Sequence, residues 1–197
     1  ETTDLALPIV FVSGEEKKEI ALNGMALFSG STKVGQMDNH DTAYYLLSVS
    51  KLNGGGYELT EETTEDGEEK YLAFVNRQSA PSHDFTFDGE RFTLIVQVEM
   101  IAAAVEFYGD WGPITEALTL QIEEDAAKML SQETEKMIRS IQTEYGIDII
   151  GFADKIHDKD PSLWKRVQEN WQEYLKNAEV QVNGKVLIND TGLIKEY

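Results

Sequence analysis

The sequence contains no cysteine, and this absence removes several kinds of site at once. Disulfide bonds, zinc centres with thiolate ligands and cysteine nucleophiles all require that residue, so all three are excluded. The same absence leaves the redox compartment open, because a chain without cysteine is compatible with oxidising and reducing surroundings alike.

Positive charge is also scarce. The 197 residues include 17 Lys and Arg against 36 Asp and Glu, which gives a formal net charge of −19. A chain this acidic repels a phosphate backbone and an anionic membrane surface. We therefore expect no nucleic-acid partner.

Long apolar runs are missing as well. The longest, residues 94–105, is interrupted by Gln97 and Glu99 and falls short of the roughly 20 residues that a membrane-spanning helix needs. The sequence starts at Glu1 rather than at Met and shows no signal peptide, so we expect any leader or anchor to lie outside it.

The apolar residues that are present suffice for a core. Hydrophobic residues make up 41% of the chain, including eight Phe and three Trp, which is typical of one folded domain. Alternating or β-branched stretches predict strands, and residues spaced three or four apart predict helices. The expected strands are 5–12 (a short strand or extended arm), 20–28, 33–37, 57–60 and 70–79. A hairpin is expected at 83–100 with an Asp88-Gly89 type I′ turn, and a closing strand within 178–194.

The expected helices have recognisable ends. Asp38, Asn39 and Asp41 are capping residues before a helix that stops at the glycines 54–56. A long amphipathic helix runs from Pro113 to Gly146. Shorter helices follow at about 147–157 and from Pro161 to about Leu175.

This order of elements predicts an α+β fold, with a largely antiparallel β-sheet packed against a long amphipathic helix and shorter helices. We divide the chain into residues 1–16, an N-terminal arm or remnant of a preceding domain, and residues 17–197, a single α+β C-terminal domain.

The closing segment offers two conflicting signals. Asn183-Gly184 is a strong hairpin dipeptide, but a turn there would mix polar and apolar side chains on both faces. A straight strand instead places Val180, Val182 and Val186 on one face. We therefore predict a continuous strand in which Gly184 marks a weak point or a close approach.

One stretch carries a cluster that resembles a metal or acid–base site: Asp154, His157, Asp158 and Asp160. A calcium-loop template matches Asp158, Asp160, Ser162 and Glu169, but it requires glycine where this chain has Leu163, and Pro161 lies inside it. Zinc fits poorly, because four ligands are preferred and the other histidines, His40 and His83, are distant in sequence.

Helix capping explains the same residues without a ligand. Asp160 suits an N-cap with Pro161 at the first helical position, and His157 suits a helix C-terminus. No G-x-S-x-G motif, Walker motif or Rossmann motif occurs. We therefore predict no catalytic, metal or cofactor site, and the sequence does not identify binding residues.

Three stretches together resemble the C-terminal region of the Ger(x)C family, the C subunits of bacterial spore germinant receptors. They are "IALNGMALFSGSTKVGQMDNHDTAYYLLSV", "DIIGFADKIHDKDPSLWKRVQENW", with its Asp-Ile-x-Gly-Phe and Pro-x-x-Trp helices, and the closing strand ending "TGLI". The likeness covers roughly residues 17–195.

The resemblance implies a lipoprotein at the outer face of the inner spore membrane, with a lipid anchor outside this chain. It implies two membrane-embedded partners, the A- and B-type subunits, with which the protein converts nutrient binding into germination. It also implies that this chain is the C-terminal portion of a longer protein. The family has no catalytic residues to transfer.

Three hypotheses follow. The first is a non-enzymatic receptor subunit that scaffolds a membrane complex or transmits a signal within it. The second is a module that binds a small nutrient itself, which requires a pocket with convergent polar groups. The third is a metal-dependent enzyme built on Asp154, His157 and Asp158.

Overall fold

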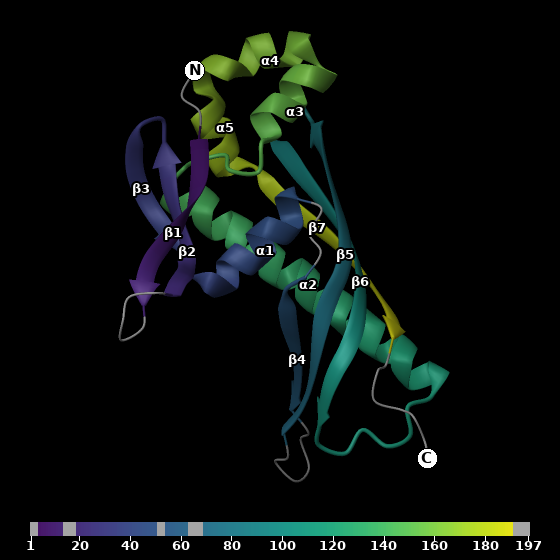
Figure 1. Ribbon diagram of the computed structural model, residues 1–197. Helices are drawn as coiled ribbons and strands as arrows, with labels where there is room; N and C mark the ends of the chain where they lie inside the picture. Colours follow the sequence, from purple (N-terminus) through teal and green to yellow (C-terminus); the bar gives the residue numbers. More distant parts are fainter. Residues whose placement is uncertain (1–3, 14–18, 51–53, 63–68, 191–197) are drawn as a thin grey trace.

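The computed structural model describes residues 4–13, 19–50, 54–62 and 69–190 (Figure 1). Its elements, in chain order, are β1 (Asp4–Ser13), β2 (Glu19–Ser29), β3 (Thr32–Met37), α1 (Asn39–Val49), β4 (Gly56–Glu62), β5 (Glu69–Phe87), β6 (Phe92–Tyr108), α2 (Glu116–Glu144), α3 (Phe152–Lys159), α4 (Pro161–Val167), a 3-10 turn η1 (Gln168–Asn170), α5 (Trp171–Asn177) and β7 (Glu179–Asp190).

The strands form two sheets rather than one. A three-stranded antiparallel sheet has the order β1-β2-β3, and a four-stranded sheet has the order β4-β5-β6-β7. In the larger sheet β6 and β7 run parallel, because the helices between them carry the chain back to the end at which β6 began. The predicted α+β class and the largely antiparallel pairing are confirmed.

The core lies between the larger sheet and α2. Figure 1 shows α2 crossing this sheet beside β7, with α3, α4 and α5 grouped beyond one end and the small sheet to one side. Buried residues recur at every second position of β6 and at three- or four-residue intervals along α2: Leu94, Val96, Val98, Met100 and Ala102, then Ile122, Ala126, Leu130, Thr134, Met137 and Ile141. These are the periods expected for a strand and a helix that share one core.

The start of α2 differs from the prediction. The helix begins at Glu116 rather than at Pro113, and the side chain of Thr115 accepts a hydrogen bond of 3.2 Å from the backbone N–H of Leu118. A threonine oxygen satisfies a free N–H of the first turn, which proline cannot do. The predicted stop at Gly146, where φ is 64°, is confirmed.

The helices after α2 are shorter than predicted. α3 begins at Phe152 and not near residue 147, because residues 147–151 form a turn. The helix expected from Pro161 to about Leu175 is divided into α4 and α5 by η1, where Asn170 leaves helical geometry at φ −120° and ψ 24°. The predicted start of that helix at Asp160-Pro161 is confirmed.

β5 is one long strand where two segments were expected. It continues through Pro81, a residue that normally argues against a central strand. β4 pairs with β5 as far as Val75, and beyond that residue no strand of the described part of the chain pairs with β5 on that side. Proline is tolerated there because an edge strand does not need every N–H for the ladder.

The predicted hairpin between β5 and β6 is present, but its turn is not the two-residue type. Phe87 pairs with Phe92, so the loop contains four residues. The carboxylate of Asp88 accepts hydrogen bonds of 2.8 Å from the backbone N–H groups of both Glu90 and Arg91. This side-chain bonding stabilises the wider loop, and it is a role that Asp commonly takes in turns.

β7 is the straight strand that the alternation predicted, and α2 covers its free edge. Gly184 marks a close approach: a Cβ atom there would lie 2.7 Å from the carbonyl oxygen of Ala127. Three hydrogen bonds join the two elements, from Arg139 Nη2 to the Val180 carbonyl (3.3 Å), from the Gly184 N–H to Ser131 Oγ (2.8 Å), and from the Ile188 N–H to Glu123 Oε1 (2.6 Å).

Candidate functional site

The acidic cluster at residues 154–160 forms two helix ends. Asp154 lies in the first turn of α3 and His157 in its last turn, while Asp160 Oδ1 accepts a hydrogen bond of 2.8 Å from the backbone N–H of Leu163. The helix dipole favours an acid such as Asp154 near the N-terminus of α3 and a cation such as protonated His157 near its C-terminus. Asp160 is the N-cap of α4.

The helical geometry of this cluster does not support a calcium or zinc site. α4 occupies Pro161–Val167, so the middle of the calcium-loop template is helical and Leu163 is buried. His157 Nδ1 and Asp158 Oδ1 lie 3.7 Å apart on exposed side chains. Within the described part of the chain, no third ligand atom joins them at metal-binding spacing.

Three potential ligand atoms do come together elsewhere, at the start of α1. They belong to Asp38, His40 and Asp41. Asp38 is the N-cap of α1, and its Oδ1 accepts a hydrogen bond of 2.9 Å from the backbone N–H of Asp41. This cap accounts for the position of the Asp38 carboxylate without an ion.

Asp148 organises the turn between α2 and α3; it begins the Asp-Ile-x-Gly-Phe motif, but the sequence analysis assigned it no role. Its Oδ1 accepts hydrogen bonds from the N–H groups of Gly151 (2.9 Å) and Phe152 (3.1 Å), and its Oδ2 accepts one from Ala153 (2.7 Å). Burial raises the pKa of the Asp148 carboxyl, and these three donors work in the opposite direction.

This turn gives a physical meaning to the Asp-Ile-x-Gly-Phe motif. Gly151 adopts φ 87°, which favours glycine, and it lets the chain turn so that the ring of Phe152 is fully buried. The backbone N–H of Asp148 donates to the carboxylate of Asp4 at 2.8 Å, which fastens β1 to the same turn. The motif is therefore a structural corner.

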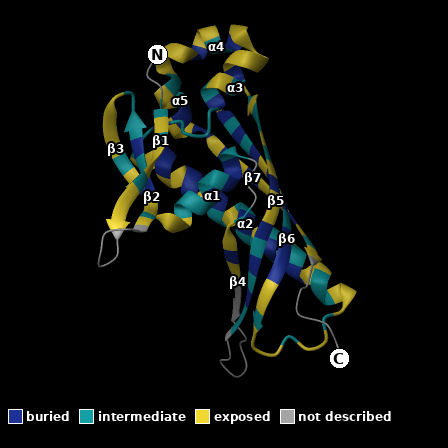
Figure 2. Cartoon of the chain, in the orientation of Figure 1, coloured by how far each residue is buried: buried dark blue, intermediate teal, exposed yellow. Residues whose placement is uncertain are grey.

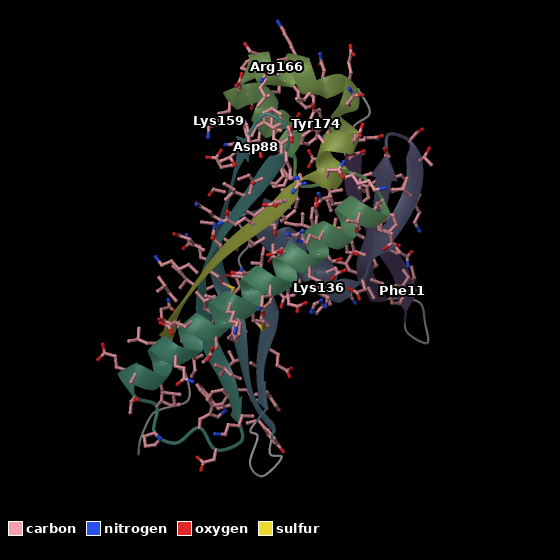
Figure 3. All side chains as sticks on the ribbon, turned by 180° about the vertical axis from the view of Figure 1, so that it is seen from behind. Phe11, Asp88, Lys136, Lys159, Arg166 and Tyr174 are labelled. Carbon is pink, nitrogen blue, oxygen red and sulfur yellow. The ribbon has the colours of Figure 1, made fainter. Side chains whose placement is uncertain are left out.

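A polar hollow of about 560 Å³ lies between the β5–β6 loop and α5. Figure 3 shows two of its residues, Asp88 and Tyr174, at the end of the molecule that carries the short helices. Hydrogen bonds from the backbone of Arg91 and Glu90 lower the pKa of Asp88, so its carboxylate already serves the loop. The lining consists of Asp88, Glu90, Arg91, Asn170, Glu173, Tyr174 and Asn177.

The most distinctive surface is the outer face of the β1–β2 hairpin. In Figure 2 buried residues gather in the larger sheet and α2, whereas β1 and β3 are mainly exposed or intermediate. Cross-strand neighbours lie on the same face of a sheet, and four successive outward pairs are apolar. They are Leu5–Phe28, Leu7–Ala26, Val10–Leu22 and Val12–Ile20.

Six of these eight side chains are strongly exposed, by between 42% and 76%. The opposite face joins the core through Met25 and Leu27. Near the hairpin tip both faces are open, because Phe11 on that opposite face is also exposed (Figure 3). We call the eight outward residues the apolar face.

The sequence predicted these strands but not the exposure. Residues 5–12 form an almost unbroken apolar run, which is typical of a strand covered on both sides. The alternation at Ile20 and Leu22 indicated one apolar side but not whether anything covers it.

None of the helices among the described residues combines the length and apolar character that crossing a membrane requires.

Comparisons with known proteins identify the family. A family model described as "Spore germination B3/ GerAC like, C-terminal" matches residues 23–192. Spore germination protein YndF of Bacillus subtilis (strain 168) is 22% identical over 182 residues, covering 89% of this chain and 43% of that protein. Spore germination protein KC of the same organism is 34% identical over 73 residues, covering 36% of this chain and 18% of that protein.

The fold also has a counterpart of known structure. The crystal structure of the GerBC protein superposes with a TM-score of 0.77 at 16% identity, covering 96% of this chain and 57% of that one. This chain thus spans less than half of the two curated relatives. The likeness of the three sequence motifs to germinant receptor C subunits is confirmed, and the chain belongs to the spore germination B3/GerAC-like family, whose C-terminal region it matches.

Proposed function

We propose that this chain is the C-terminal module of a non-enzymatic subunit of a spore germinant receptor, needed for nutrient-triggered germination. The observation that carries the proposal is the family match, which extends over residues 23–192. The structure is compatible with it, because the acidic cluster at residues 154–160 is used for helix ends rather than for a reacting centre.

The module acts as a scaffold or a signal-transmitting part of a membrane complex. Two structural features support this role: α2 seals the edge of the larger sheet, which gives a rigid body, and the apolar face provides a contact surface. Its partners are the membrane-embedded A- and B-type subunits.

Attachment to the membrane comes through a lipid anchor at the outer face of the inner spore membrane, outside these 197 residues. The net charge of −19 opposes direct contact with anionic lipid, so the module itself is held away from the bilayer surface. In this proposal residues 17–197 are the C-terminal domain, and residues 1–16, which include the β1 strand paired with β2, connect it to the part of the protein that precedes it.

Deletion of the gene tests this proposal. Spores of the parent organism that lack this gene and related C-subunit genes should fail to respond to nutrients, measured as loss of refractility and optical density after nutrient addition. Reintroducing this gene alone should restore at least one nutrient response. An unchanged response in the deletion strain would contradict the proposal.

A second candidate function, binding of a small polar nutrient, is favoured by the polar hollow. Its carboxylates, amides, guanidinium and phenol are the kinds of group that orient a polar ligand. Amino acids or sugars should then raise the melting temperature, and Asn170→Ala should remove the effect. Gln132→Ala, at an exposed position of α2 that does not line the hollow, should keep it. No shift with any such nutrient would rule the hollow out as its binding site.

A further inference from the structure

We propose that the apolar face of the β1–β2 hairpin is the seat of the protein region that precedes this module in the intact subunit. The face consists of Leu5, Leu7, Val10 and Val12 from β1 and Ile20, Leu22, Ala26 and Phe28 from β2. In this arrangement the hairpin is the joint between two parts of one chain.

The composition of the face argues for a partner that covers it. In the whole chain 27% of residues are charged, yet the eight outward positions carry no charge and no polar side chain. An antiparallel sheet with one solvated face normally alternates apolar inward and polar outward residues. In the β1–β2 hairpin the outward positions are apolar as well, and polar side chains enter this face only where β3 places Gln36 beside Ala26 and Lys33 beside Phe28. Contiguous exposed apolar surface of this kind marks an interaction site.

The β1–β2 hairpin that carries the apolar face is attached to the rest of the fold at one end. The carboxylate of Asp4, at the start of β1, accepts the backbone N–H of Asp148 in the buried turn before α3. Met25 and Leu27 of β2 are buried in the core from the opposite side. A face fixed in this way is preorganised for docking, which lowers the entropy that a partner must lose.

Charge and chain length select the occupant. Two copies of a chain with net charge −19 repel each other, and so do this chain and an anionic membrane. The matched family region is described as C-terminal, and the curated relatives are more than twice as long as the part this chain covers. A preceding region is tethered directly to β1, so it meets the face at high effective concentration without a second molecule.

The chain offers a clean test because it contains no cysteine. In the full-length subunit, with any cysteine of the remaining sequence replaced by serine, single substitutions Leu7→Cys, Val12→Cys and Leu22→Cys report on the face. Leu120→Cys, at a residue of α2 that is 54% exposed, is the matched control. The measurement is the rate at which a water-soluble maleimide labels each thiol.

The three face positions should be labelled roughly tenfold or more slowly than Leu120→Cys in the native full-length subunit, and at equal rates in denaturant. Equal rates in the native protein at all three positions would overturn the inference. Protection that disappears on dilution would overturn it as well, because a second copy would then be the occupant. The labelling uses the isolated subunit, so its outcome is independent of the germination assay.

Discussion

At the residue scale, the corner around Phe152 is held by contacts from several parts of the chain. Its ring is buried, the carboxylate of Asp148 holds its backbone N–H, and the ring of His83 packs edge-on against it at 5.8 Å. The Nε2 of His83 lies 2.6 Å from the carbonyl oxygen of Ser48, so the imidazole also joins β5 to the end of α1. His83 of β5 therefore contacts both α1 and α3, two helices that are distant from it in the sequence.

This geometry predicts a pH dependence of stability. Burial lowers the pKa of His83, the Ser48 carbonyl acts in the opposite direction, and Lys155 lowers it further while Asp148 raises it. Because the folded-state pKa lies below the unfolded value of about 6.5, the folded state binds fewer protons. The contribution of His83 is complete above that unfolded value and is lost as the pH falls through the folded-state pKa.

Urea unfolding measures this loss. Between pH 7 and about pH 5.5, the free energy of unfolding should fall in the wild type and much less in His83→Gln. His157→Gln removes an exposed imidazole and should leave the wild-type fall in place. Parallel curves for the wild type and His83→Gln would contradict the prediction.

At the element scale, the sequence correctly predicted the features that depend on neighbouring residues. The cap at Asp160-Pro161, the stop at Gly146 and the straight course of β7 all depend on nearby residues or on simple alternation, and all are confirmed. The continuity of β5 through Pro81 was missed, because it depends on where β4 stops pairing. Such an edge is set by another part of the chain and leaves no local signal.

The same limit applies to the candidate surface. The strands of the apolar face were predicted from their residues, but the exposure of Ile20 and Leu22 depends on the rest of the fold. The role of Asp148 was not predicted, although this residue begins the Asp-Ile-x-Gly-Phe motif. Its three N–H donors lie three to five residues later, and they reach its carboxylate in a turn where Gly151 adopts φ 87°.

The contact of α2 with β7 yields the second prediction. Gly184→Ala would place a methyl group 2.7 Å from the Ala127 carbonyl oxygen and 2.8 Å from Ser131 Oγ, so the helix must move. We expect a loss of about 1–3 kcal/mol in the free energy of unfolding, measured by urea titration. Gly56→Ala, in β4 with no atom within 4 Å of the added Cβ, should change it by less than about 0.5 kcal/mol. Equal effects of the two substitutions would show that α2 does not press on β7.

At the scale of the whole molecule, charge is the dominant property. A net charge of −19 on one folded body causes repulsion that weakens the compact state. Added salt shortens the distance over which these charges interact, from about 30 Å at 0.01 M to about 8 Å at 0.15 M. We therefore expect the melting temperature to rise over this range of NaCl.

The control for the salt effect is a variant with less negative charge. Glu124→Lys with Glu144→Lys changes two exposed positions of α2 that lie outside its first turn, and should show a smaller rise between the same salt concentrations. A melting temperature that stays constant or falls in the wild type would mean that favourable charge pairs outweigh the repulsion.

The three hydrogen bonds between α2 and β7 occur at regular intervals that match in length between the two elements. They recur every four residues on the strand and every eight on the helix, at Val180, Gly184 and Ile188 against Arg139, Ser131 and Glu123. Four strand residues span about 13 Å and eight helical residues about 12 Å, so the two spacings agree. Inserting or deleting one residue in either element would shift part of this series out of step. We therefore expect the fold to tolerate amino-acid substitutions in α2 and β7 more readily than insertions or deletions.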